Sequence, residues 1–248
     1  MTHETRGEQS PDPSAPPLRV EAVVSPVFGA VCRVLGGADG GPCVIVDPGV
    51  AVAGGVRAAV AAHGWRPLAV LATHGHVDHT FDAAELADGY GVALRLHRAD
   101  AYRVEDPFGT IEGPVPGVLS AALRAGGADP AAYRVPRRVE PFGGGPGGGD
   151  GAATGPGPAD GLGLRAVHAP GHTEGSTLYV GGGLALTGDV LFAGTVGRTD
   201  LPGGDADAMR RTLRDVVGRL GDDVVVLPGH GPSTTMARER AANPFLRV

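Results

Sequence analysis

The sequence predicts an α/β fold built as a single domain. Two series of short valine-rich segments are separated by Gly-Gly and Gly-Pro turn signals, which indicates two antiparallel meanders. Alanine-rich or helically periodic segments lie between and after these strands. The length of 248 residues is enough for one sizeable core, so one domain is expected.

The first half of the chain is expected to open with a meander and to continue as alternating helices and strands. The meander comprises strands over residues 18–24, 30–35 and 43–46. Helices are then expected over residues 55–62, 81–86 and 118–125, and strands over residues 68–72 and 92–96.

The second half opens with a second meander, expected over residues 164–167, 177–180 and 184–186. Asp205 is predicted to cap a helix that continues to the stop signal Gly221, because apolar residues recur at helical spacing between them. A strand over residues 224–227 and a final helix over residues 234–242 complete the predicted elements.

Two segments are expected to lie outside the packed core. Residues 1–17 are polar, contain several prolines and lack periodicity, so we expect a disordered N-terminal tail. Residues 143–163 contain eleven glycines, which predicts a flexible loop on the surface.

Composition and charge narrow the classes of function. The formal net charge of −6 argues against nucleic acid or a membrane surface as a partner, because both require a basic face. The chain contains no lysine, which excludes a phosphate-binding GK[ST] loop and a lysine Schiff base. No signal peptide or long apolar run is found, so we expect a soluble cytoplasmic protein. Cys32 and Cys43 match no metal or redox spacing and are expected as buried free thiols.

Potential metal ligands follow four of the expected strands, at the point where each strand ends. They are His74, His76, Asp78 and His79, then His172, then Asp189, then His230. Open α/β architectures place sites at such strand ends, and imidazole with carboxylate suits zinc, iron or manganese. His74 and His76 are two residues apart, so both rings can reach one ion. Asp78 and His79 can face a second ion, and Asp189 is the candidate for a bridge between the two.

Four motifs contain these ligands: THGHVDH at residues 73–79, GHTEGS at 171–176, Gly188-Asp189 and Gly229-His230-Gly231. In this order they resemble the metal-binding motifs of the metallo-β-lactamase superfamily, over residues 18–248. The order of the motifs and the bridging aspartate resemble the hydroxyacylglutathione hydrolase (glyoxalase II) branch. Residues 197–204 and 243–246 are similar to segments of its single-domain members. The resemblance implies an αββα sandwich with metals at one edge between two sheets, in a single catalytic domain.

The resemblance also assigns the ligands. One ion would be bound by His74, His76 and His172, the second by Asp78, His79 and His230, with Asp189 as the bridge. Two divalent ions are therefore expected, zinc in the first place, with iron or manganese as alternatives. Asp78 is also expected to assist proton transfer, so Asp78 and Asp189 are the candidate catalytic residues.

The implied activity is hydrolysis of a small-molecule thioester, an S-(2-hydroxyacyl) thiol, by a metal-bridging hydroxide. Two alternatives stay open: a persulfide dioxygenase of the same fold with one iron, and a non-catalytic metal-binding member of the fold. β-Lactamase activity is disfavoured, because enzymes with that activity generally lack an acidic residue at the position that Asp189 occupies here. Only eighteen residues follow His230, so the helical domain with which two-domain glyoxalase II enzymes hold glutathione has no counterpart, and the thiol is left open. The oligomeric state is also left open.

Five other residues are expected to have supporting roles. Asp47 is predicted to cap a turn or to lie behind the metal ligands. His63 is expected to interact with a helix dipole, while His97 and His168 are predicted to be structural. Tyr179 is expected as a buried aromatic residue of a strand.

Arg198 has two open roles. A loop arginine near a metal edge can bind a substrate carboxylate through a bidentate pair, which makes it a candidate substrate-binding residue. A salt bridge to Asp200 or Asp205 is the alternative.

Overall fold

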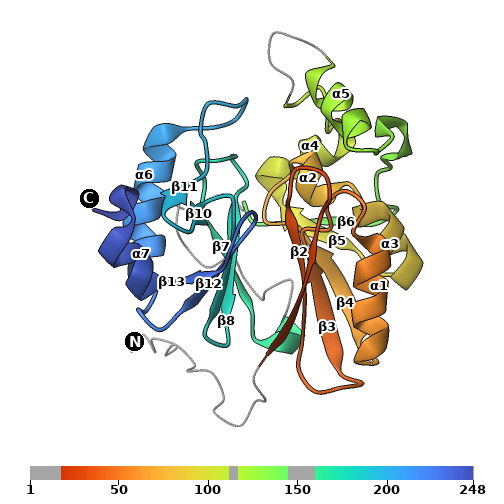
Figure 1. Ribbon diagram of the computed structural model, residues 1–248, viewed down its shortest axis with the longest axis horizontal. Coiled ribbons are helices and arrows are strands. Elements are labelled where there is room, and N and C mark those ends of the chain that lie inside the picture. The colour runs from red at the N-terminus through yellow and green to blue at the C-terminus, as the bar shows by residue number, and fades with distance from the viewer. Residues whose placement is uncertain (1–17, 112–116, 145–159, 248) are drawn as a thin grey trace, which may run out of the picture.

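The computed structural model describes residues 18–111, 117–144 and 160–247. The expected N-terminal tail and most of the glycine-rich segment 143–163 lie outside the described residues. Two sheets pack face to face, and helices cover their outer faces (Figure 1). This is the αββα sandwich that the sequence predicts.

The first sheet has six strands in the spatial order β1-β2-β3-β4-β5-β6. Their bounds are β1 (Arg19–Val24), β2 (Val31–Gly36), β3 (Pro42–Val46), β4 (Arg66–Leu71), β5 (Leu94–His97) and β6 (Val139–Phe142). The first three strands form the expected antiparallel meander, whereas β3, β4, β5 and β6 are parallel. Parallel pairing requires crossovers, and the helices between these strands provide them.

The second sheet has five strands in the order β13-β12-β9-β8-β7. Their bounds are β7 (Arg165–His168), β8 (Thr177–Gly181), β9 (Leu184–Gly188), β12 (Val225–Pro228) and β13 (Thr234–Thr235). The second meander is confirmed, because β7, β8 and β9 pair antiparallel in sequence order. Strand β12 pairs parallel with β9, so both strands end at the same edge. A short hairpin, β10 (Leu191–Phe192) with β11 (Thr195–Val196), follows β9.

Helices lie on the outer faces of both sheets (Figure 1). Helices α1 (Ala53–Ala62) and α3 (Ala83–Tyr90) cover the first sheet, and α6 (Ala206–Asp215) and α7 (Met236–Ala242) cover the second. The remaining helices are α2 (Val77–Thr80), α4 (Ala101–Glu105) and α5 (Val118–Ala125). Within the described parts of the chain, no helix is long and apolar enough to cross a membrane.

The inner strands β3, β8 and β9 are buried on two faces, which explains their nearly continuous apolar sequences. In β3, Cys43 and Ile45 face the helices, whereas Val44 and Val46 face the second sheet. Tyr179 lies in this central layer, fully buried, and its hydroxyl donates to the carbonyl of Ala72 at 3.0 Å. Its predicted role is confirmed, and Cys32 and Cys43 are buried free thiols as expected.

Two helices differ from the prediction. The helix expected over 81–86 in fact runs from Ala83 to Tyr90 as α3, and a separate short helix, α2, precedes it. The Asp82 carboxylate between the two accepts the main-chain N–H groups of Val52 and Ala53 (2.7 and 2.8 Å). The helix expected to reach Gly221 ends at Asp215, where Val216 has a φ of −112°, far from the helical value of about −63°. A 3₁₀ turn, Val217–Arg219, then continues the buried apolar face.

Candidate metal centre

Three imidazoles meet at the edge between the two sheets. His74 and His76 lie in the turn after β4, and His172 lies in the loop after β7. Nε2 of His74 and Nε2 of His172 lie 3.1 and 3.0 Å from Nδ1 of His76. All three side chains are buried. We call them the first ligand group, because their nitrogens are close enough to hold one ion.

A second cluster lies beside the first. Asp78 and His79 belong to the short helix α2, and His230 follows β12. Nε2 of His79 and Nε2 of His230 are 3.2 Å apart, and Oδ2 of Asp78 is 3.3 Å from the same atom of His230. These residues form the second ligand group, which could also hold an ion. The structure thus brings together the two sets of three that the sequence predicts.

Asp189, directly after β9, faces both ligand groups. Its Oδ1 lies 3.4 Å from Nε2 of His79, while its Oδ2 lies 3.7 Å from Nε2 of His172 and 3.6 Å from Nε2 of His230. Oδ1 is buried and accepts no hydrogen bond from the described residues. Such a carboxylate oxygen is costly in a protein interior unless a cation neutralises it. The donor set therefore fits metal ions in contact with this carboxylate.

Asp47 orients one imidazole of each ligand group from behind. Its Oδ2 lies 3.1 Å from Nδ1 of His79 and accepts the hydroxyl proton of Thr73 at 2.7 Å. The same Thr73 oxygen lies 3.1 Å from Nδ1 of His74 and can accept its proton. Because carboxylate and hydroxyl oxygens accept here, both rings can keep a proton on Nδ1, which leaves Nε2 as the atom that would bind an ion in place of a proton. The predicted place of Asp47 behind the ligands agrees with this geometry.

Arg198 contributes through its main chain in a way that the sequence did not indicate. Its carbonyl oxygen lies 2.8 Å from Nδ1 of His172 and accepts the proton of that ring. Its exposed guanidinium forms a bidentate pair with Asp200, with two distances of 2.7 Å. Of the two roles open to the side chain, the structure shows the salt bridge.

The carboxylates of the cluster create a negative potential that favours a positive charge at its centre. Burial and the neighbouring imidazoles hold the pKa of His74 well below its usual value, so this ring is neutral. Burial opposes a charge on His79, but Asp189, Asp78 and Asp47 outweigh it and raise its pKa to about 10. Burial also raises the pKa of Asp189. Three carboxylates around one imidazole are balanced here by a proton, and a divalent cation would replace that proton.

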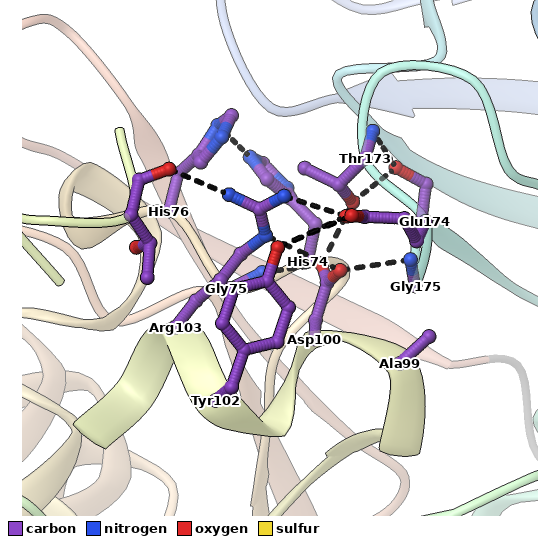
Figure 2. Close-up of polar contacts among 12 residues, drawn as sticks. His74, Gly75, His76, Ala99, Asp100, Tyr102, Arg103, Thr173, Glu174 and Gly175 are labelled. Carbon is purple, nitrogen blue, oxygen red and sulfur yellow. Dashed lines mark hydrogen bonds and ion pairs between the residues drawn. The ribbon is translucent and has the colours of Figure 1, made fainter. Parts of the chain in front are cut away.

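Asp100 supports the centre without being a ligand, and no chemistry was predicted for its segment from the sequence. It ends the 3₁₀ turn Arg98–Asp100 after β5, and its buried carboxylate lies between the turns that carry the first ligand group (Figure 2). The sequence feature that could have identified Asp100 is an acidic residue shortly after the strand predicted over 92–96, which runs parallel to β4.

Three other histidines of the described residues, His63, His97 and His168, lie apart from the ligand groups. The rings of His97 and His168 stack on each other with centroids 4.0 Å apart and planes at 6°. His63 follows α1 and bonds to Glu21 and Asp39 at 2.9 and 3.0 Å. All three have structural contacts, as expected, although His63 interacts with carboxylates rather than with the helix dipole alone.

Comparisons with known proteins agree with this architecture. A sequence profile described as the metallo-beta-lactamase superfamily matches residues 27–230, a range that includes every residue of both ligand groups. A protein of Mycobacterium tuberculosis, described as uncharacterized, is 38% identical over 222 residues, which are 87% of this chain and 92% of that protein. The hydroxyacylglutathione hydrolase GloC of Haemophilus influenzae is 31% identical over 180 residues, 71% of this chain and 74% of GloC. The crystal structure of TTHA1623 in a di-iron-bound form has a TM-score of 0.70 at 29% identity, covering 92% of this chain and 100% of that one.

Proposed function

Since the chain belongs to the metallo-β-lactamase superfamily, we propose that it is a dinuclear metal-dependent hydrolase that cleaves an S-(2-hydroxyacyl) thioester. Residues 18–248 form its catalytic domain in this proposal. Its substrate is a small molecule of the cytoplasm, and neither nucleic acid nor a membrane is a partner.

The observation that carries the proposal is the position of the Asp189 carboxylate. Its Oδ1 lies beside His79 of the second ligand group, its Oδ2 lies between His172 of the first group and His230 of the second, and Oδ1 accepts no hydrogen bond from the described part of the chain. One carboxylate between two sets of three ligands is the arrangement expected for a pair of ions that share a bridge. The di-iron-bound form of TTHA1623 supports two ions in this proposal, and the name of GloC, a hydroxyacylglutathione hydrolase, supports the class of substrate.

In the mechanism, the first ligand group and the second ligand group would each hold one ion. When bound, a pair of divalent ions supplies a nucleophile by lowering the pKa of water and polarises a carbonyl oxygen. Asp189 holds the two groups in register. Burial opposes ionisation of Asp78, but His79 and the hydrogen bond with His230 outweigh it and lower its pKa, so this carboxylate is ionised and suited to hold a cation. Its part in proton transfer is a proposal that rests on its place beside the reacting centre.

The supporting residues keep the imidazoles in their ligating form. Asp47 holds the ring of His79, and the carbonyl of Arg198 holds the ring of His172. A thiol leaves as thiolate with an ordinary pKa of about 8.5, so the reaction requires no strong general acid.

A second candidate has its own observation. His74, His79 and Asp189 also lie within reach of one ion. Two imidazoles and one carboxylate are the ligand set of mononuclear non-haem iron oxygenases. A persulfide dioxygenase with one iron would use such a set.

One experiment separates these functions. Metal content per chain is measured together with turnover on lactoyl adducts of several cellular thiols, and oxygen uptake is recorded with a thiol persulfide. We expect two ions, thioester hydrolysis and no oxygen uptake, with β-lactams and phosphodiesters cleaved far more slowly. One iron with oxygen uptake would favour the dioxygenase. Two ions without any turnover would favour a non-catalytic metal-binding protein, and equal rates on all three substrate classes would refute the thioester assignment.

A further inference from the structure

The carboxylate of Asp100 joins two segments that are far apart in the sequence. Asp100 is 0% exposed and directly precedes α4. On one side is the turn that contains Gly75, between His74 and His76. On the other side is the loop Thr173–Gly175, which directly follows His172 (Figure 2). All three imidazoles of the first ligand group are thus next to a main-chain segment that Asp100 contacts.

Three short hydrogen bonds make this connection. Oδ2 of Asp100 accepts the main-chain N–H of Gly75 at 2.8 Å and the hydroxyl proton of Thr173 at 2.7 Å. Oδ1 accepts the main-chain N–H of Gly175 at 2.8 Å. Oδ2 thus bonds to the Gly75 turn and to the loop after His172, whereas Oδ1 bonds to that loop alone. Because the carboxylate is planar and rigid, it fixes the distance between the two segments.

The two glycines allow the carboxylate to come this close. A Cβ atom at Gly75 would lie 2.9 Å from the carbonyl oxygen of Asp100 and 2.8 Å from Cβ of Arg103. A Cβ atom at Gly175 would lie 2.5 Å from Cγ of Asp100. Any side chain at either position would therefore push Asp100 away from the turn that it holds.

Arg103 supports this arrangement from the next turn of the chain. Its buried guanidinium has Nε 3.5 Å from Oδ1 of Asp100. Its Nη2 donates to Oε2 of Glu174 at 2.5 Å and to the carbonyl of Pro202 at 2.9 Å. Since Glu174 lies within the loop that Asp100 contacts, the bond from Arg103 to Glu174 stabilises the same loop at a second point. Its positive charge also balances the buried carboxylate.

We propose that Asp100 is a positioning residue for the first metal position: it presets the turns of His74, His76 and His172 so that their nitrogens converge before an ion binds. The inference rests on the proposed metal centre but not on the thioester substrate. Asp47 has the corresponding contact with the second ligand group through His79. Loss of Asp100 is therefore expected to weaken one metal position selectively.

The test uses the full chain after metal removal, with Co²⁺ as the probe. Co²⁺ is titrated into the wild type and into Asp100→Asn, and its visible absorption reports the affinity and the coordination of each position. His172→Ala and His230→Ala serve as references that assign the spectra of the two positions. In Asp100→Asn we expect a loss of about 10- to 100-fold in affinity at the first position, the range found for partners behind metal ligands. The second position should change by less than about threefold.

Glu239→Gln is the matched control. Glu239 is also a buried carboxylate, 1% exposed, and it accepts bonds from the main-chain N–H of Gly194, the Thr234 hydroxyl and the Asn243 amide. None of these three donors lies in a turn that carries the first ligand group. We expect a lowered melting temperature with unchanged Co²⁺ affinity. Equal weakening by both variants would show a general loss of stability and would overturn the inference.

Thr173→Val covers the case in which Asp100→Asn does not fold. It removes one of the three donors and keeps the shape of the side chain, so we expect a smaller, selective loss at the first position. Wild-type affinity at both positions in Thr173→Val and in any folded Asp100 variant would also overturn the inference. A wild type that binds two Co²⁺ ions but cleaves no thioester would refute the proposed function and leave the role of Asp100 intact.

Discussion

Oδ1 of Asp189 lies 3.4 Å from Nε2 of His79, and no hydrogen bond from the described residues reaches that oxygen. An unpartnered carboxylate oxygen therefore faces an imidazole at the centre of the cluster, where a cation would replace the proton of that ring. Removing the carboxylate should have a larger effect on metal content than on folding, because the surrounding turns are held by other bonds.

The first prediction concerns Asp189→Ala. We expect metal content to fall from two ions to one, with a loss in affinity of more than about 100-fold for the second ion, above the range for partners behind the ligands. Thioester turnover should fall with it, while circular dichroism and melting temperature stay close to those of the wild type. Retention of two tightly bound ions with normal hydrolysis would contradict the bridging assignment. Asp215→Ala, which removes an exposed aspartate at the end of α6, is the control for loss of charge.

The second prediction concerns Asp47→Asn. The Oδ2 atom that faces Nδ1 of His79 would become either an amide donor or a weaker acceptor, so the ring would no longer be held in one tautomer. We expect a loss of about 10- to 100-fold in affinity at the second ligand group and a smaller loss at the first, where Asp47 acts only through Thr73. The Co²⁺ titration that tests Asp100 measures both. The same pattern of loss in the Asp47 and Asp100 variants would contradict a division of labour between them.

The third prediction concerns the side chain of Arg198. Its pair with Asp200 is exposed, and such pairs contribute only about 0–1 kcal/mol, so a substrate carboxylate could replace Asp200 at little cost. In Arg198→Ala we expect an increase of about tenfold in KM for a thiol adduct that carries a carboxylate, with kcat unchanged. Metal content should stay the same because the carbonyl that orients His172 remains. An unchanged KM for charged and neutral adducts alike would exclude the substrate role.

The fourth prediction concerns the dependence of stability on pH at His63. Hydrogen bonds with Glu21 and Asp39 raise its pKa above the usual value of about 6.5. The folded state therefore binds the proton more tightly than the unfolded state. This stabilisation is fully present below about pH 6.5 and is lost as the pH rises through the folded-state pKa.

His63→Gln should accordingly lower the melting temperature more at pH 5.5 than at pH 9. Thermal unfolding monitored by circular dichroism at both values measures this difference. Glu21→Gln, which removes the larger of the two causes, should show part of the same pH dependence. A difference between wild type and His63→Gln that is equal at both pH values would contradict the prediction.

Much of the centre could be predicted because the ligands follow strands. Parallel strands that share a sheet end at the same edge, so residues after β4 and those after β9 and β12 are brought to one place once two sheets pack together. The two meanders were also legible, since valine-rich segments and glycine turns specify local pairing. Helix boundaries were less legible: the helix expected to begin at residue 81 begins at Ala83, after Asp82, whose carboxylate accepts the main-chain N–H groups of Val52 and Ala53. These are contacts across about thirty residues that no local pattern contains.

The sequence by itself indicated the kind of centre: the spacing of THGHVDH separated His74 and His76 from Asp78 and His79, with Asp189 as a candidate bridge. The resemblance to the family motifs then assigned His172 and His230 to the two sets. Only the tertiary structure showed which groups orient these ligands. The carbonyl of Arg198 against His172, and the carboxylate of Asp100 between Gly75 and Gly175, connect segments 25 to 75 residues apart. A main-chain carbonyl has no sequence signature, and a single aspartate after a strand has a weak one. Their roles arise from burial and distance, which exist only when the two sheets are packed.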